Sequence, residues 1–485
     1  MQIKCDKKIT LTPNQFYENK ELYLEDAVKL LSVQAFARTT SVEALNGEIR
    51  TGYCLTIRAL YINQDGMVEK KEELYDLAST IRAGVSVNSH VIVNTSVIGV
   101  EYHGVQNLKV RVMLEQKGCY LQDSSFEPCD KESICYKKKG LVVRNIFPFR
   151  SAEFIIDKTE NIKNSVGQIL GVDAVICAKN VSCATDLCEI EGIANVYFTH
   201  LVDGELKGQN LKFPFSYELL AEGIKEGDEV ELFFTPVSTT LALNEENGGV
   251  EASLQILVEI KGYSERNVEI DYPLDAYSKE HEIALEYGEV VLHEKTCSIK
   301  TKENFLTSLS LGEIADVVEI INIGTPWVGA SNVSANSSIT VDGVICSEIL
   351  LKRENGEYAR VLAEIPYSFD LKEEATCSND LDVIIDVVDV GARVRFGSSL
   401  EIFGEISIRV SGHSEVVVSY LEKVEAIGEK TKNDAVISVY LVGQGETLFD
   451  CAKALQSDEE ELLALNPDLD LPLKEGDKVL LYRPL

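Results

Sequence analysis

The chain contains an internal repeat, which constrains its fold more than any other feature of the sequence. The second and third copies keep their landmarks in step: Pro214, in a Pro-Phe-Ser sequence, corresponds to Pro366, in a Pro-Tyr-Ser sequence. Each copy then closes on a Gly-x-Ser-Glu sequence, which begins at Gly262 and at Gly412, 48 and 46 residues after the proline. A period of roughly 150 residues is typical of tandem copies of one domain.

A first, more diverged copy precedes these two, with Leu74-Tyr75-Asp76 in place of the proline motif. The connecting segments also repeat, since Lys131 and Gly140 match Lys279 and Gly288 at a constant offset of 148 residues. We therefore predict three β domains, each followed by a linker, and a C-terminal module. In chain order, the predicted boundaries are 1–125, 126–147, 148–270, 271–291, 292–425, 426–435 and 436–485.

Within each copy the hydrophobic residues favour strands. Segments 53–57, 254–258 and 402–410 alternate or run apolar and are rich in β-branched and aromatic residues. The Asn-Gly and Asp-Gly sequences between such segments are typical of hairpin turns. The sequence thus predicts a mainly β protein with three tandem antiparallel domains of the β-sandwich type.

The last fifty residues change character. Thr447 is the predicted N-cap of a helix, with Asp450 as its capping-box partner, and Ser457 is the predicted cap of a second helix that Asn466-Pro467 ends. The result is a small βααβ module, whose strand, two helices and return strand are predicted over residues 436–442, 449–455, 458–465 and 479–482.

The composition excludes several functions. With 46 Lys and Arg against 79 Asp and Glu, the formal net charge is −33, which repels nucleic acid and anionic lipid. The N-terminus lacks the apolar stretch of a signal peptide, and no apolar run approaches the roughly 18 residues of a spanning helix, so we expect a cytoplasmic protein. The twelve cysteines include no C-x-x-C pair, and we expect reduced core thiols.

Motifs that carry catalysis are missing from the sequence. The six histidines include no pair spaced to present two metal ligands on one face. There is no nucleophile elbow, no phosphate-binding loop and no dinucleotide fingerprint. We therefore predict a protein that is not an enzyme, with no catalytic residue, no metal site and no cofactor.

Two features admit a functional interpretation that we do not favour. Asp382, Asp386 and Asp389 suggest a Ca²⁺ site, but the strand period places Asp389 on the opposite face, so we expect solvent-facing carboxylates. Trp327, the only tryptophan, is either an exposed anchor for a partner or a core residue, and we favour the core.

The C-terminal module resembles a LysM domain. The resemblance rests on the order of Tyr440, Val442, Gly445-Glu446-Thr447-Leu448, Ala452, Leu462, Asn466-Pro467, Leu473 and Gly476. One departure is Glu446, where the family usually has Asp. In the family, the functional surface is a shallow groove between two loops. The resemblance therefore implies a partner-binding site at Gly445, Glu446, Thr447, Leu448, Phe449, Leu465, Asn466, Pro467, Asp468 and Leu469. The same residues equally suit capping and packing, and both interpretations stay open.

The three upstream copies resemble the SPOCS domain of spore-coat morphogenetic proteins. The resemblance rests on the hairpin followed by Pro-Phe-Ser or Pro-Tyr-Ser, and on Asp275-Ala276-Tyr277-Ser278 in the second linker. SPOCS domains ending in LysM are similar to coat proteins of the SipL type. This implies a scaffold in spore envelope assembly that moves from the mother-cell cytoplasm to the forespore surface. Its LysM module is then expected to bind the ATPase of the coat basement layer, or another coat protein.

Two other functions remain as alternatives. A wall protein would use LysM to bind N-acetylglucosamine polymers of the peptidoglycan or chitin type, and a lattice or fibre subunit would self-associate through exposed strand edges. A wall protein needs a secretion route. Residues 436–485 hold four basic and ten acidic side chains, a charge that favours a basic protein partner over a glycan.

Overall fold

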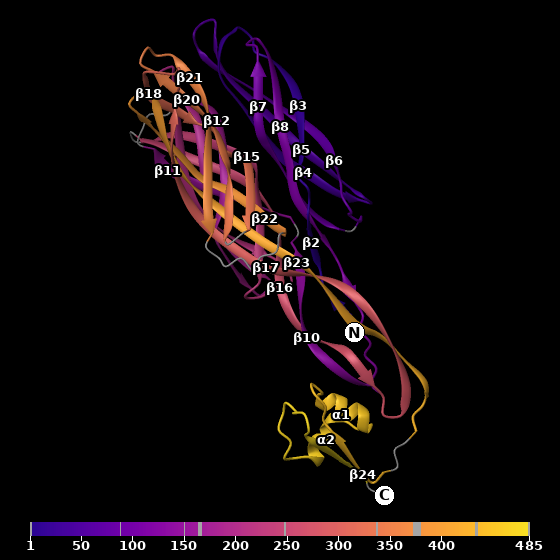
Figure 1. Cartoon of the computed structure of the whole chain (residues 1–485). Helices are drawn as coiled ribbons and strands as arrows, with labels where there is room; N and C mark the ends of the chain where they lie inside the picture. The colour runs from indigo at the N-terminus through magenta and orange to yellow at the C-terminus, as the bar shows by residue number, and fades with distance from the viewer. Residues whose placement is uncertain are drawn as a thin grey trace.

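The computed structural model describes residues 2–87, 89–149, 151–162, 167–246, 249–335, 338–371, 380–431 and 435–483. The protein is mainly β, as predicted, with many antiparallel sheets and two short helices. The molecule is elongated: long β-sheets fill one end, and the helical C-terminal module lies at the other (Figure 1).

Three pairs of antiparallel sheets follow one another along the chain. The first pair joins a meander, β4-β5-β6, to a second sheet in which β8 lies between β7 on one side and β2 and β3 on the other. Its strands are β2 (Lys7–Thr10), β3 (Asn14–Tyr23), β4 (Ala27–Leu45), β5 (Glu48–Asn63), β6 (Val68–Arg82), β7 (His90–His103) and β8 (Asn107–Gln122).

The second pair has the same strand order. Its meander is β12-β13-β14, and in its second sheet β16 lies between β15 on one side and β10 and β11 on the other. Its strands are β10 (Cys135–Pro148), β11 (Ala152–Ile162), β12 (Ile169–Ala184), β13 (Leu187–Val202), β14 (Glu205–Leu220), β15 (Glu229–Glu246) and β16 (Gly249–Tyr277).

The third pair repeats the order with two differences. Its second sheet is β22-β23-β17, in which one long strand replaces the two that flank β8 and β16, and the first meander strand is split into β18 and β19 around Pro326. Proline cannot donate to a ladder, which accounts for the split. The strands are β17 (His281–Ser310), β18 (Val317–Ile323), β19 (Trp327–Ala335), β20 (Ile339–Arg353), β21 (Tyr358–Leu371), β22 (Asp380–Arg395) and β23 (Ser399–Glu429).

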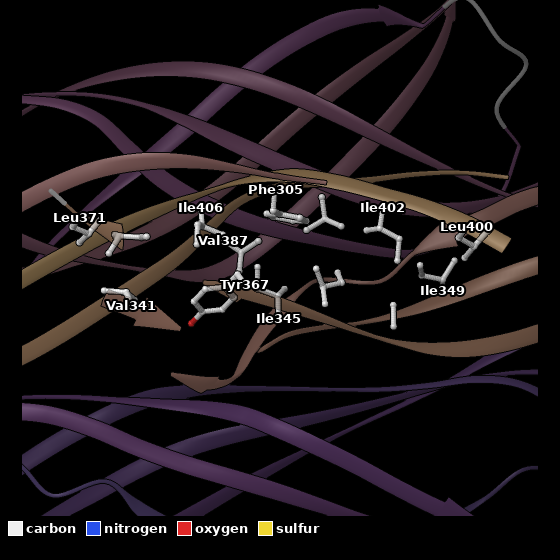
Figure 2. Close-up of a cluster of buried hydrophobic side chains, with 14 of the residues drawn as sticks. Phe305, Val341, Ile345, Ile349, Tyr367, Leu371, Val387, Leu400, Ile402 and Ile406 are labelled. Carbon is white, nitrogen blue, oxygen red and sulfur yellow. The ribbon is translucent and has the colours of Figure 1, made fainter. Parts of the chain in front are cut away.

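Each sheet pair encloses its own apolar core. In the third pair, Phe305 of β17 and Ile402 of β23 face Ile345 of β20 and Tyr367 of β21 (Figure 2). Along β21 the buried residues alternate with outward ones, which is the period of two seen in the sequence. Along β20, Cys346 and Leu350 are buried on the second face as well.

The repeated proline motif has a packing role next to a glycine. The aromatic residue of each motif lies opposite a glycine of the central meander strand, Phe215 opposite Gly192 and Tyr367 opposite Gly343. A Cβ on either glycine would overlap the aromatic side chain and a backbone carbonyl. The glycine therefore makes room for the ring, and both aromatic residues are buried.

We predict that Gly343→Ala destabilises the protein by about 2 kcal/mol, because the new methyl overpacks the site beneath Tyr367. Urea denaturation would measure the loss. Gly140→Ala is the matched control, since its added Cβ would meet only Asp271 Oδ1, at 3.9 Å. Equal stability of the two variants would contradict this packing role.

The segments predicted as the first two linkers are largely strands. Residues 126–147 include β10, and residues 271–291 include the end of β16 and the start of β17. β10 pairs with the second half of β16, and the first half of β17 pairs with the second half of β23. We call these two packed ladders the ribbon region. The third predicted linker, 426–435, begins within β23, and its residues 432–434 lie outside the described part of the chain.

Apolar side chains hold the ribbon region together. Val143 and Tyr272 of one ladder pack with Leu292 and Tyr420 of the other. The N-terminal strand β1 (Ile3–Lys4), paired with β9 (Ser125–Phe126), adds Ile3 and Phe126 to this cluster. Both ladders extend from the sheet pairs toward the C-terminal module (Figure 1).

A buried network of charges joins the three sheet pairs. Glu265, in the Gly-x-Ser-Glu sequence of β16, accepts from Arg144 of β10 and from Lys295 of β17, the latter at 3.2 Å. Burial alone raises the pKa of Glu265, but Arg144 and Lys295 lower it below its ordinary value. Lys8 of the first sheet pair binds Asp382 of the third at 3.1 Å. We call these residues, with His413, the junction network.

Two sequence expectations are corrected at the contacts between sheet pairs. The three aspartates of β22 do not simply face solvent: Asp382 binds Lys8, Asp386 binds Arg409 at 2.7 Å, and Asp389 binds Lys212 of β14 at 2.6 Å. A bulge between Val387 and Asp389 shifts the strand register. A prediction from a strict period of two could not include this shift.

Trp327 is neither a core residue nor a free anchor. It is half-buried, and its indole Nε1 donates to the carbonyl of Ile98 in β7 at 3.2 Å. The side chain thus joins the third sheet pair to the first.

The cysteines of the described chain are all free thiols. Cys183 and Cys188 lie opposite each other on β12 and β13 with their sulfurs 3.4 Å apart, and neither is in a disulfide. Cys377 lies outside the described residues.

Acid is expected to weaken the junction network through His413. Burial, then Arg144 and Lys8, lower the pKa of His413 to about 4, and its Nδ1 lies 3.1 Å from Arg144 Nη1. The folded protein therefore favours neutral His413, and its contribution to stability is complete above pH about 6.5 and is lost as the pH falls toward 4.

We predict a loss of about 1 kcal/mol between pH 7 and pH 5, a value reduced for the partial exposure of the ring. Urea denaturation across this range would measure it, and His413→Gln should flatten the profile. His281→Gln, at an exposed position of β17, is the control and should keep the wild-type slope. An unchanged slope in the His413 variant would contradict the assignment.

Candidate partner-binding surface of the C-terminal module

The C-terminal module forms from two helices packed on a two-stranded sheet. β24 (Ile437–Leu441) pairs antiparallel with β25 (Lys478–Tyr482), and α1 (Leu448–Leu455) and α2 (Glu459–Leu465) lie between them in sequence. Thr447 is the N-cap of α1, as predicted, and its N–H donates to Asp450 at 2.8 Å. α2 starts one residue later than predicted, because Asp458 and not Ser457 is its N-cap.

Several residues of the predicted groove serve the module's own fold. Leu448 and Phe449 are buried in its core with Leu462. The side-chain amide of Asn466 donates to the carbonyls of Leu462 and Leu480, each at 2.7 Å, and its oxygen accepts from the N–H of Leu480 at 2.8 Å. Asn466 thus ties the end of α2 to β25, and packing accounts for its presence.

Glu446 is also used within the module. Its carboxylate accepts from the N–H of Gly443 at 2.7 Å and from the hydroxyl of Tyr440 at 2.9 Å. The hydrogen bond to Glu446 raises the pKa of Tyr440 above its ordinary value. Glu446 therefore braces the loop before α1.

The remaining residues of the predicted groove differ in exposure. Leu469 is half-buried against the module core, while the others lie at the surface. The exposed members are Gly445, Thr447, Leu465, Pro467 and Asp468.

Part of the predicted groove is covered by the ribbon region. The Phe449 ring lies edge-on to Tyr277, with centroids 5.1 Å apart, and Asp450 binds Lys137 of β10 at 3.2 Å. Burial alone raises the pKa of Asp450, but hydrogen bonds from Thr447 and the ammonium of Lys137 lower it. The start of α1 therefore has a partner within the chain.

An exposed apolar surface on the module was missed by the sequence interpretation. Outward positions of β24 and β25 carry large apolar side chains that are 45–65% exposed. Register pairs Ile437 with Tyr482 and Val439 with Leu480, so these four lie on one face, with Leu441 next along β24. We call Ile437, Val439, Leu441, Leu480 and Tyr482 the hairpin face. The signal was present in the alternation of 437–441. Ser438 and Tyr440 are half-buried, while the apolar residues Ile437, Val439 and Leu441 are exposed.

Comparisons of the chain with protein-family models, with curated proteins and with solved structures each found no match. Within the described residues, no group of three or more His, Cys, Asp or Glu side chains is placed to hold a metal ion. No helix in the described part of the chain is both long and apolar enough to cross a membrane.

We predict that Asn466→Ala destabilises the C-terminal module by about 2 kcal/mol, because it leaves buried backbone groups of Leu462 and Leu480 without partners. Faster hydrogen exchange of the α1 amides in the full chain would report the loss. Asp468→Ala, two residues on and exposed, is the control. If both variants exchange alike, Asn466 has no structural role here.

Proposed function

We propose that this chain is a non-enzymatic scaffold of the spore envelope that binds a coat basement-layer protein through its C-terminal module. The resemblance of the repeats to SPOCS domains and of the module to LysM supports a role in assembly of the spore envelope. On this proposal the chain starts in the mother-cell cytoplasm and acts at the forespore surface, and the partner is the coat ATPase or another coat protein.

The hairpin face is the observation that carries the binding role. Its large apolar side chains lie together on one side of a two-stranded sheet, where they remain in contact with water. Contiguous exposed apolar surface of this kind marks sites of protein interaction. Lys478 lies opposite Leu441, so a positive charge borders the apolar side chains at one end of the face.

The body of the protein suits a spacer. Three sheet pairs of similar strand order are joined by buried charges, and the ribbon region extends from them to the module (Figure 1). A long β body of this kind holds two ends apart and presents the module at one of them. This arrangement supports a scaffold better than a small carbohydrate-binding protein.

The state of the groove also weighs against the glycan alternative. Leu448, Phe449 and Asn466 are buried or bonded within the module, and the chain itself covers Phe449 and Asp450. A sugar polymer would have to displace Tyr277 and Lys137 to reach the start of α1. The hairpin face has no such cover.

We predict that Ile437→Asp in the full chain weakens binding to the purified coat basement-layer ATPase by about 30-fold, equivalent to about 2 kcal/mol. The new carboxylate would be buried beneath the partner at one end of the apolar face. Surface plasmon resonance would measure the affinity. Leu306→Asp, at an exposed apolar position of β17, is the matched control and should bind as wild type does.

Two results would count against this proposal. Equal affinity of Ile437→Asp and wild type would remove the hairpin face from the interface. Tight binding of wild type to N-acetylglucosamine hexamer, with no binding to the ATPase, would replace the scaffold proposal by the wall-binding alternative.

A further inference from the structure

The contact between α1 and the ribbon region has complementary charges on both sides. Lys137 of β10 and Asp275 of β16 lie opposite each other across the ladder. Asp450 and Lys453 are three residues apart on α1 and so lie on one face of the helix. Lys137 binds Asp450 at 3.2 Å, and Lys453 binds Asp275 at 2.7 Å, so two pairs of opposite sign meet in register.

An aromatic side chain fills the centre of this contact. Tyr277, at the end of β16, is buried against the module, and its ring contacts Phe449. Its hydroxyl donates to the carbonyl of Ser457 at 2.5 Å, just beyond the end of α1. Lys279 adds an ion pair with Asp458, the N-cap of α2, at 2.7 Å. We call residues 135–137 and 275–279 the ribbon tip.

The ion pairs of this contact are partly exposed, unlike those of a domain core. Lys279 and Asp458 are both exposed by more than two fifths. Such pairs are individually weak and are screened by salt. The apolar area that holds the contact is essentially that of Tyr277 and its neighbour Cys135, the members of the module's apolar cluster that come from the ribbon. The contact therefore combines one buried aromatic side chain with ion pairs that salt weakens.

We propose that the ribbon tip occupies the start of α1 as an internal substitute for a protein ligand, so that the chain masks part of its own binding surface. The ligand it imitates is a strand that presents an aromatic side chain beside a lysine. This inference rests on the proposed function in one respect, that the module binds a protein. It adds a second surface, distinct from the hairpin face, that becomes available only when the module separates from the ribbon tip.

The masking itself can be tested with the full chain alone. A carbodiimide joins Lys453 to Asp275 only while the two are in contact, and mass spectrometry measures the yield. Lys137→Glu combined with Tyr277→Ala should reduce this cross-link at least fivefold at low salt, and 0.5 M NaCl should reduce it in wild type. The control combines Lys139→Glu with Val417→Ala, two exposed positions of the same ribbon region, and should keep the wild-type yield.

The chemistry of the ligand can be tested by supplying the ribbon tip as a separate molecule. The probe is a cyclic peptide that joins residues 272–279 to residues 133–139 through a tight turn. We expect it to bind the Lys137→Glu/Tyr277→Ala chain at least tenfold more tightly than wild type, whose own ribbon tip occupies the site. The same peptide with Ser in place of Tyr277 and Glu in place of Lys137 should not bind.

The outcomes separate this inference from the proposed function, because neither experiment contains the coat ATPase. An unchanged cross-link in the double variant, or equal binding of the peptide to both chains, would overturn the masking. Peptide binding as expected, in a chain that does not bind the ATPase, would leave the masking in place while the scaffold proposal fails.

Discussion

The buried carboxylate of Glu265 is the interaction on which the arrangement of the sheet pairs depends. It lies where β16 leaves its own sheet pair and enters the ribbon region, and it receives Arg144 from one ladder and Lys295 from the other. A carboxylate this deeply buried is costly unless cations and hydrogen bonds compensate it. Removing either partner leaves a buried charge, so the ladders and the sheets are held to one geometry. The long strands β16 and β23 continue from the sheet pairs into the ribbon region, so the position of the ribbon region depends on this geometry.

The repeated motifs acquire separate physical roles in the folded chain. The proline motif supplies an aromatic ring that covers a glycine of the neighbouring strand, as Tyr367 covers Gly343. The Gly-x-Ser-Glu sequence lies where a strand passes from a core into the ribbon region, and there the two copies differ. Glu265 is buried in the junction network, whereas Glu415 is largely exposed beside His293, at 3.2 Å. One local sequence thus serves a buried junction in one copy and a surface contact in the other.

The sequence was sufficient for the fold class and for the elements of the module, because periods of two and helix caps are local signals. Thr447 as an N-cap and the strands of the repeats follow from neighbours in the chain. The long-range contacts were not accessible in this way. Nothing near Asp389 indicates that Lys212 will bind it, and the bulge before it reverses the expected side. The contact of Tyr277 with Phe449 likewise forms only because the ribbon region brings the end of β16 to the module.

Ion pairs therefore act at two strengths in this protein, and burial decides which. At the junction, the side chains of Arg144 and Glu265 are 4% and 10% exposed, so water and salt hardly screen their attraction. At the ribbon tip, Lys137 and Asp450 are 34% and 29% exposed, so their attraction is weak and falls with ionic strength. Added salt is therefore expected to weaken the contact of the module before it weakens the junction. On the masking proposal, a partner that displaces the ribbon tip leaves the buried ion pairs of the junction unchanged.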